Sequence, residues 1–220
     1  MSDVIKDIKD SQLATYHRGK SWEYCYTFFR NYKKFRGNNE FLDHAALHLG
    51  FFLASWGMLR GSSFLLQKDY KFYIPIVKIL IDSKYEKLWS FDFSQKSREQ
   101  NINLLFGLEE RLKAVFVENN RKDGDNKEHK TELIITKIIM ATMGCAPSYD
   151  RYFKDGLKKM GWGALGTFKQ DSFQKLLGLT ERHKELKGIY EIQCFIKDSD
   201  IKHPPMKLLD LYFWLLGSQK

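Results

Sequence analysis

The chain has 220 residues, of which 43% are hydrophobic and 29% are charged. This composition excludes a disordered chain, and no apolar run approaches the roughly 18–20 residues that a membrane-spanning helix needs. The net charge of +9 favours an anionic partner, most often nucleic acid.

The three cysteines, Cys25, Cys145 and Cys194, lie far apart and form no CxxC pair. This argues against a disulfide framework or a cysteine zinc site and favours a reducing compartment. The first residues, MSDVIKDIKDSQL, alternate charged and apolar side chains and do not resemble a signal peptide. We therefore expect a cytoplasmic protein without a membrane partner, and the sequence indicates no cofactor.

Helical spacing of apolar residues dominates the chain, and strand signals are scarce. The sequence predicts a mainly α fold, a single helical domain of about nine helices over residues 1–220, with a lobe seam at 119–130. A short strand at 189–196 is an alternative to helix there. The predicted helices include residues 1–16, 21–36, 40–59, 72–90, 95–119, 151–160, 168–179 and 181–192.

The end of the second predicted helix combines cations with aromatic residues. The cations are Arg30, Lys33, Lys34 and Arg36. Two interpretations stay open: a surface that contacts phosphates, or a solvated helix end whose cations face the negative pole of the helix dipole.

The third predicted helix carries His44 and His48 on one face, with Asp43 beside them. This spacing can bind a metal, so a metal-dependent hydrolase is one hypothesis, although the glutamate of an HExxH motif is absent. Arg60 follows this helix as an anion clamp or as the partner of Asp43 or Asp69.

The segment from Lys130 to Phe153, KTELIITKIIMATMGCAPSYDRYF, has the clearest functional pattern. Its apolar residues have the spacing of a central buried helix, which breaks at Gly144 and Pro147. Asp150 then stands at the start of the next helix. It either caps that helix by accepting free N–H groups, or it is a catalytic carboxylate beside a buried helix.

This order of Lys-Thr, apolar helix, proline loop and Asp150 resembles the helix-hairpin-helix DNA glycosylase superfamily. The segment before Lys130 holds a single glycine, Gly124, where that family has a glycine-rich hairpin. The resemblance implies cleavage of the N-glycosidic bond of a flipped base, with Asp150 as catalytic carboxylate. Lys130, or else Lys137, would be the amine if a Schiff base forms.

The same hypothesis assigns residues around this segment to nucleic acid, with DNA ahead of RNA. The bases would stack on Tyr149, Tyr152 and Trp162, and the phosphates would bind Arg151, Lys154, Lys158 and Lys159. The alternative is a non-catalytic basic helical module that binds nucleic acid or a protein.

Overall fold

The computed structural model describes residues 2–14, 16–32, 38–91, 95–122, 124–125 and 127–219. Over these residues the fold is mainly α, as predicted, and the only β pairing is an isolated antiparallel bridge between Phe195 and Lys202. The α-helices are α1 Ser2–Leu13, α2 Gly19–Arg30, α3 Asn39–Ser55, α4 Ile74–Leu80, α5 Gln95–Lys122, α6 Glu132–Thr142, α7 Arg151–Lys159, α8 Gln170–Arg182 and α9 Pro205–Ser218.

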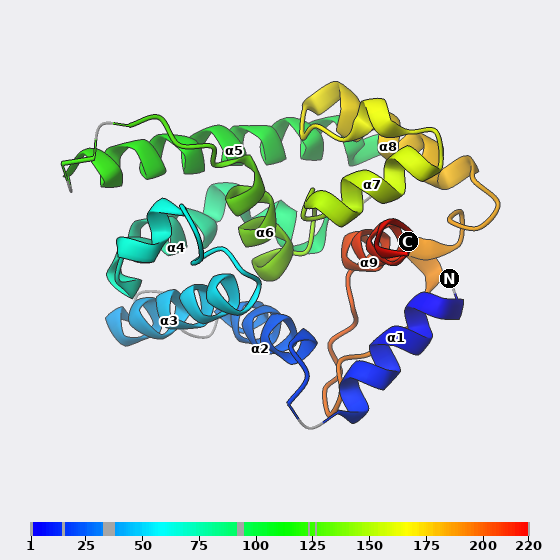
Figure 1. Ribbon diagram of the computed structural model, residues 1–220, viewed down its shortest axis with the longest axis horizontal. Coiled ribbons are helices and arrows are strands. Elements are labelled where there is room, and N and C mark those ends of the chain that lie inside the picture. Colours follow the sequence, from blue (N-terminus) through cyan, green and yellow to red (C-terminus); the bar gives the residue numbers. More distant parts are fainter. Residues whose placement is uncertain are drawn as a thin grey trace.

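Helix α6 is the centre of the molecule, as its apolar sequence predicts. It lies between the long helix α5 on one side and α2 and α3 on the other (Figure 1). Every residue from 134 to 149 is buried, so the burial continues through the loop that leads to α7. This loop is consequently packed within the core.

Helices α7 and α9 pack side by side at unusually short range (Figure 1). Gly156 of α7 faces the backbone of Phe213 in α9, and Gly217 of α9 faces the backbone of Tyr152 and Gly156 in α7. A Cβ atom on Gly217 would lie 2.6 Å from the amide nitrogen of Gly156. The two glycines therefore allow the backbones to approach more closely than any other residue would permit.

Three predicted elements differ from the structure. The helix predicted at 72–90 is α4 followed by a 3-10 helix, Ser83–Ser90, because the Asp82 side chain accepts a hydrogen bond from the Lys84 amide and starts a new turn. The helix predicted at 181–192 is absent: α8 ends at Arg182 and only Ile189–Glu191 forms a 3-10 turn. The alternative strand at 189–196 is reduced to the bridge at Phe195.

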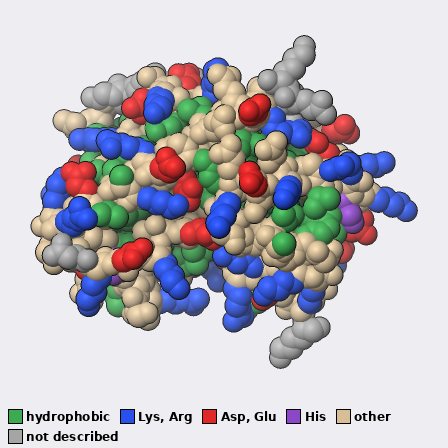
Figure 2. Space-filling model, turned by 90° about the horizontal axis from the view of Figure 1, so that it is seen from above, with side chains coloured by type: hydrophobic (Ala, Val, Ile, Leu, Met, Phe, Trp, Pro, Cys, Tyr) green, Lys and Arg blue, Asp and Glu red, His purple; other side chains and the backbone are tan. Residues whose placement is uncertain are grey.

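Helix α1 lies apart from the main helical layers and packs on α2 and α9 (Figure 1). Its apolar side chains Val4 and Ile8 are buried. On the face seen from above in Figure 1, Lys and Arg are interspersed with Asp and Glu, so the basic excess does not form one continuous patch there (Figure 2). Within the described ranges, no helix combines the length and apolar character needed to cross a membrane.

Candidate functional site

Asp150 makes two contacts, one through each oxygen of its carboxylate. Its Oδ1 accepts a hydrogen bond of 3.0 Å from the Phe153 amide, which confirms the predicted cap of α7. Its Oδ2 lies 3.5 Å from Nζ of Lys137, a buried lysine in the middle of α6. The carboxylate therefore links the start of α7 to the central helix, and its side chain is only 16% exposed.

A second pair of opposite charges lies on α9. Lys207 and Asp210 are one helical turn apart and both buried, with Nζ 3.7 Å from Oδ2. Ser148 holds the other oxygen of Asp210, because its backbone amide and its hydroxyl each donate a hydrogen bond of 2.7 Å to Oδ1. The loop before α7 thus positions both aspartates, Asp150 directly and Asp210 through Ser148.

The two pairs form one electrostatic cluster around the Trp56 ring. The ammonium groups of Lys137 and Lys207 lie 5.1 and 4.8 Å from the centroid of this ring. Lys207 also lies 5.2 Å from the Trp22 centroid. Both lysines therefore interact with an aromatic face as well as with a carboxylate.

Burial changes the protonation of the α9 pair. Burial lowers the pKa of Lys207, and the nearby Lys137 ammonium lowers it further, against the attraction of Asp210 and Asp150. Burial raises the pKa of Asp210, and Asp150 raises it further, against Lys207 and the Ser148 hydrogen bonds. Both shifts favour the neutral amine and the neutral carboxylic acid over the ion pair.

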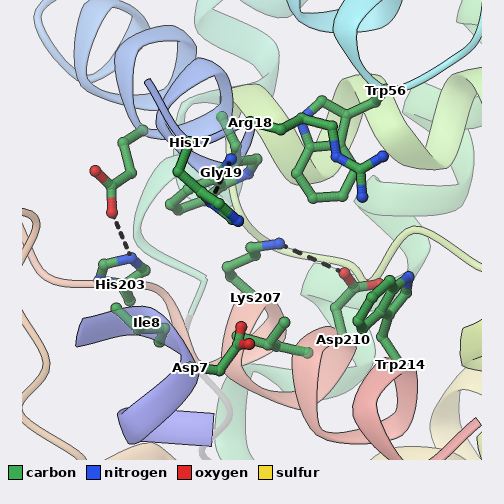
Figure 3. A pocket seen from close by; sticks show the side chains of 13 residues that line it. Asp7, Ile8, His17, Arg18, Gly19, Trp56, His203, Lys207, Asp210 and Trp214 are labelled. Carbon is green, nitrogen blue, oxygen red and sulfur yellow. Dashed lines mark hydrogen bonds and ion pairs between the residues drawn. The ribbon is translucent and has the colours of Figure 1, made fainter. Parts of the chain in front are cut away.

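This pair forms part of the wall of a cavity of about 130 Å³ (Figure 3). The cavity lies between α1, α2 and α9, and Lys207 and Asp210 point into it. Its lining residues are Asp7, Ile8, His17, Arg18, Gly19, Trp22, Glu23, Trp56, His203, Lys207, Asp210, Leu211 and Trp214. Three tryptophans and four buried ionisable groups, Glu23, His203, Lys207 and Asp210, therefore converge on one small space.

Hydrogen bonds fix the positions of two of the tryptophans. The Trp22 indole donates to the Met140 carbonyl oxygen at 3.2 Å, and the Trp56 indole donates to the Ser21 hydroxyl at 3.0 Å. Arg18 lies at the rim with its guanidinium carbon 5.3 Å from the Trp56 centroid. The aromatic walls are thus preorganised, and a cation stands at the entrance.

His203 forms the wall behind Trp22. Its ring stacks on Trp22 with centroids 5.4 Å apart, and its Nε2 lies 3.4 Å from Oε1 of the buried Glu23. Burial alone lowers the pKa of His203, but its contacts with Cys194 and Glu23 outweigh this and raise the pKa. Folding therefore favours the charged form of His203 relative to the unfolded chain.

The His203–Glu23 contact predicts a pH dependence of stability. Because the folded pKa of His203 is raised above its ordinary value of 6.5, the stabilisation is fully present below that value and is lost as pH rises through the folded pKa. We expect the free energy of unfolding, measured with urea, to fall from about pH 6 to about pH 8 in wild type. In Glu23→Gln this decline should be weaker, and an equal decline in both proteins would contradict the assignment.

The structure separates the two lysines proposed as amines. Lys137 contacts Asp150, whereas Lys130 is exposed and lies two residues before α6 begins. Lys137, the second choice of amine, is therefore the lysine that contacts the carboxylate named by the resemblance.

The predicted phosphate-binding residues are dispersed. Arg30 donates a hydrogen bond to the Trp89 carbonyl oxygen, while Lys33, Lys34 and Arg36 lie outside the described residues. Arg60 is exposed, and its guanidinium packs against Gly57.

The cations of α7 lie along one exposed to half-buried face, and three of the four have partners. Lys154 pairs with Glu132 at 3.1 Å, Lys158 with Asp155 at 3.0 Å, and the Lys159 amine donates to the Gln219 carbonyl oxygen at 2.7 Å. The guanidinium of Arg151 lies 4.7 Å from the ring centroid of Tyr152.

Of the three proposed stacking residues, Tyr152 contacts a residue that lines the cavity. Its ring meets the cavity residue Trp214 edge to face, with centroids 5.3 Å apart. Tyr149 is buried and packs against Phe153 and Phe168, so it offers no open face to a base. Trp162 is half-buried and packs against Phe213 and His183.

The proposed metal ligands do not form a cluster. His48 stacks on Phe28 at 4.1 Å between centroids, while His44 is exposed. Burial lowers the pKa of His48, and His44 lowers it further. In the part of the chain that the structure describes, no group of three or more His, Cys, Asp or Glu side chains could hold a metal.

The residues that sequence reasoning missed are mainly on α2 and α9: Arg18, Trp22, Glu23, His203, Lys207, Asp210 and Trp214. One signal was present. Lys207 and Asp210 are the only charged residues in the otherwise apolar segment MKLLDLYFWLLG, and their i, i+3 spacing places them on one face. Charges at such positions in a buried helix indicate a polar site.

In comparisons with known proteins, no family model, no curated protein and no solved structure matches this chain.

Proposed function

We propose that the protein acts on nucleic acid as a base-excision enzyme of the DNA glycosylase type, and that the cavity holds the flipped base. The observation that carries this proposal is the cavity itself, where Trp22, Trp56 and Trp214 surround the Lys207–Asp210 pair. Asp150, the carboxylate named by the resemblance, belongs to the same electrostatic cluster, because it influences the pKa of both members of that pair.

The size and walls of the cavity suit a single aromatic ring. A cavity of about 150 Å³ accommodates benzene, so the 130 Å³ found here suits a ring of pyrimidine size. Stacking of a base on an aromatic side chain contributes about 1–3 kcal/mol. Lys207 and Asp210 supply the hydrogen-bonding groups that would orient the edge of the base.

The two aspartates support a division of roles in cleavage of the glycosidic bond. Burial raises the pKa of Asp210, which favours the protonated acid, and in that form the residue would donate a proton to the leaving base. Asp150 is an ion-paired carboxylate and would stabilise the positive charge that develops on the sugar. Lys137 holds Asp150 in place through the same ion pair.

Cations near the entrance suit the phosphates that flank a flipped nucleotide. Arg18 is exposed at the rim of the cavity, and Arg151 is exposed beside Tyr152, which contacts Trp214. Such contacts should make binding sensitive to salt.

The test is base release from duplex oligonucleotides that each carry one uracil, hypoxanthine, oxidised or alkylated base. Hot alkali cleaves the strand wherever a base has been lost. We expect release by wild type, and a decrease of about 100-fold or more in Asp210→Asn, because general acid catalysis contributes about 10²–10⁴-fold. The matched control is Asp155→Asn, which removes an exposed carboxylate of α7 and should keep full activity.

The same panel distinguishes the alternative. Salt-sensitive binding of the oligonucleotides without release of any base would favour the non-catalytic nucleic-acid-binding module. If the protein neither binds the oligonucleotides nor releases a base from them, the proposal that it acts on nucleic acid is contradicted.

A further inference from the structure

We propose that Lys207 is a carbonyl-reactive amine, which forms an imine with an aldehyde or ketone group of a ligand in the cavity while Asp210 transfers the protons. This inference rests on the geometry of the cavity and does not depend on nucleic acid being the substrate. It adds an activity to the site, namely covalent capture of a small ligand that carries a carbonyl group.

The position of the amine is suited to attack on a bound ligand. Lys207 extends from α9 into the cavity (Figure 3), and its Nζ lies 5.2 Å from the ring centroid of Trp22 and 4.8 Å from that of Trp56. The lysine is 5% exposed, so the amine is reached through the cavity and not from the open surface. A planar carbonyl compound stacked against the tryptophans would place its carbon beside this nitrogen.

The amine must be neutral to attack, and its surroundings favour the neutral form. Burial and the Lys137 ammonium lower the pKa of Lys207, while burial raises the pKa of Asp210. Desolvation in an apolar pocket beside another cation is the established way in which proteins activate a lysine nucleophile. The tryptophan walls and the second lysine supply both conditions here.

Asp210 is placed to act as the acid and base of the reaction. Its Oδ2 is 3.7 Å from Nζ, and a movement of about 0.5–1 Å brings the two atoms within hydrogen-bond range. Its Oδ1 accepts two hydrogen bonds from Ser148, which fix the carboxyl group while Oδ2 stays free to exchange a proton.

Imine formation needs no reagent other than the ligand, the Lys207 amine and the Asp210 carboxyl group. The lone pair of the Lys207 amine forms the N–C bond, the C=O π pair moves to oxygen, and that oxygen takes the proton of the Asp210 carboxylic acid. The Asp210 carboxylate then removes one proton from nitrogen, which gives a neutral carbinolamine. Return of this proton to the hydroxyl group releases water as the nitrogen lone pair forms C=N, and the iminium cation faces the Asp210 carboxylate.

Lys137 provides the internal comparison. It is as buried as Lys207 and lies against the same tryptophan, but its amine is 3.5 Å from Asp150 and it is not among the residues that line the cavity. Lys78 on α4 is an exposed reference lysine.

The experiment uses benzaldehyde, a single ring with one aldehyde group, and sodium cyanoborohydride, which reduces the imine to a stable benzylamine. After limited reaction at pH 7, peptide mapping by mass spectrometry gives the rate at each lysine. We expect Lys207 to be labelled at least about tenfold faster than Lys78, because each unit of lowered pKa raises the free-amine fraction about tenfold. Benzyl alcohol, which has the ring but no carbonyl group, should slow labelling of Lys207 alone.

Two variants separate a reactive site from a merely buried lysine. Lys137→Arg should leave labelling of Lys207 in place. Asp210→Asn should slow the labelling of Lys207 about tenfold. The Lys207 amine stays at least as neutral without the carboxylate, so the slower labelling would reflect the loss of proton transfer by Asp210. Equal labelling of Lys207 and Lys78 would overturn the proposal, and so would labelling of Lys207 in Asp210→Asn that is as fast as in wild type. The rate of labelling at Lys78 and the circular dichroism spectrum check that each variant is folded.

Discussion

The variant Gly156→Ala is expected to lose about 3 kcal/mol or more of folding free energy. The added Cβ would clash with the backbone carbonyl oxygen of Phe213 and would lie 2.9 Å from its Cα. A side chain can relieve such a clash by changing its rotamer, but backbone atoms in the middle of a helix cannot. Helices α7 and α9 would therefore have to separate. Overpacking of a core typically costs about 1–3 kcal/mol of folding free energy. We expect a cost of about 3 kcal/mol or more here because the added Cβ clashes with backbone atoms.

The measurement is urea denaturation, and the matched control is Gly107→Ala in the middle of α5. A Cβ on Gly107 would meet no atom within 4 Å, so the control should gain about 0.5–1 kcal/mol from helix propensity. Because α9 carries Lys207, Asp210 and Trp214, Gly156→Ala should also abolish selective labelling of Lys207. If Gly156→Ala were as stable as wild type, α7 and α9 would not be packed as closely as the structure shows, and the prediction would be contradicted.

The central part of the fold could be predicted from the sequence because the residues that determine it lie close together along the chain. The apolar run of α6, its end near Gly144 and Pro147, and the cap by Asp150 each depend on residues within a few positions of one another. The helix predicted at 72–90 was wrong for an equally local reason. Asp82 was not recognised as the start of a new turn.

The site could be predicted only in part, because most of it depends on packing between distant segments. The sequence pointed to Asp150 and to Lys130, with Lys137 as the second choice of amine. It did not point to Asp210, which meets Ser148 across 62 positions of the chain, or to Trp22, which meets the Met140 carbonyl oxygen across 118. Periodicity shows that Lys207 and Asp210 share a face of α9. It does not show that this face meets Trp22 and Trp56 across an open space.

Asp210→Leu is expected to cost about 3–5 kcal/mol, whereas Lys207→Met should cost about 1 kcal/mol. The first change removes the partner of a buried amine and the acceptor of both Ser148 hydrogen bonds. The Lys207 amine and the amide and hydroxyl of Ser148 are then buried without this partner, and a buried polar group left unsatisfied costs about 1–3 kcal/mol. The second change replaces the amine by an apolar chain of similar length and leaves Asp210 bonded to Ser148.

The double variant Lys207→Met/Asp210→Leu completes a cycle that isolates the interaction. If the two groups stabilise each other in the core, the double variant should be more stable than the sum of the single changes predicts, by about 1–3 kcal/mol. Additive costs, measured by urea denaturation, would instead mean that each group is held independently, Asp210 by Ser148 and Lys207 by the tryptophans. The small cost expected for Lys207→Met has a further consequence, because it gives a folded protein without the amine. In that protein, tryptophan stacking of a ligand and capture by Lys207 can be measured separately.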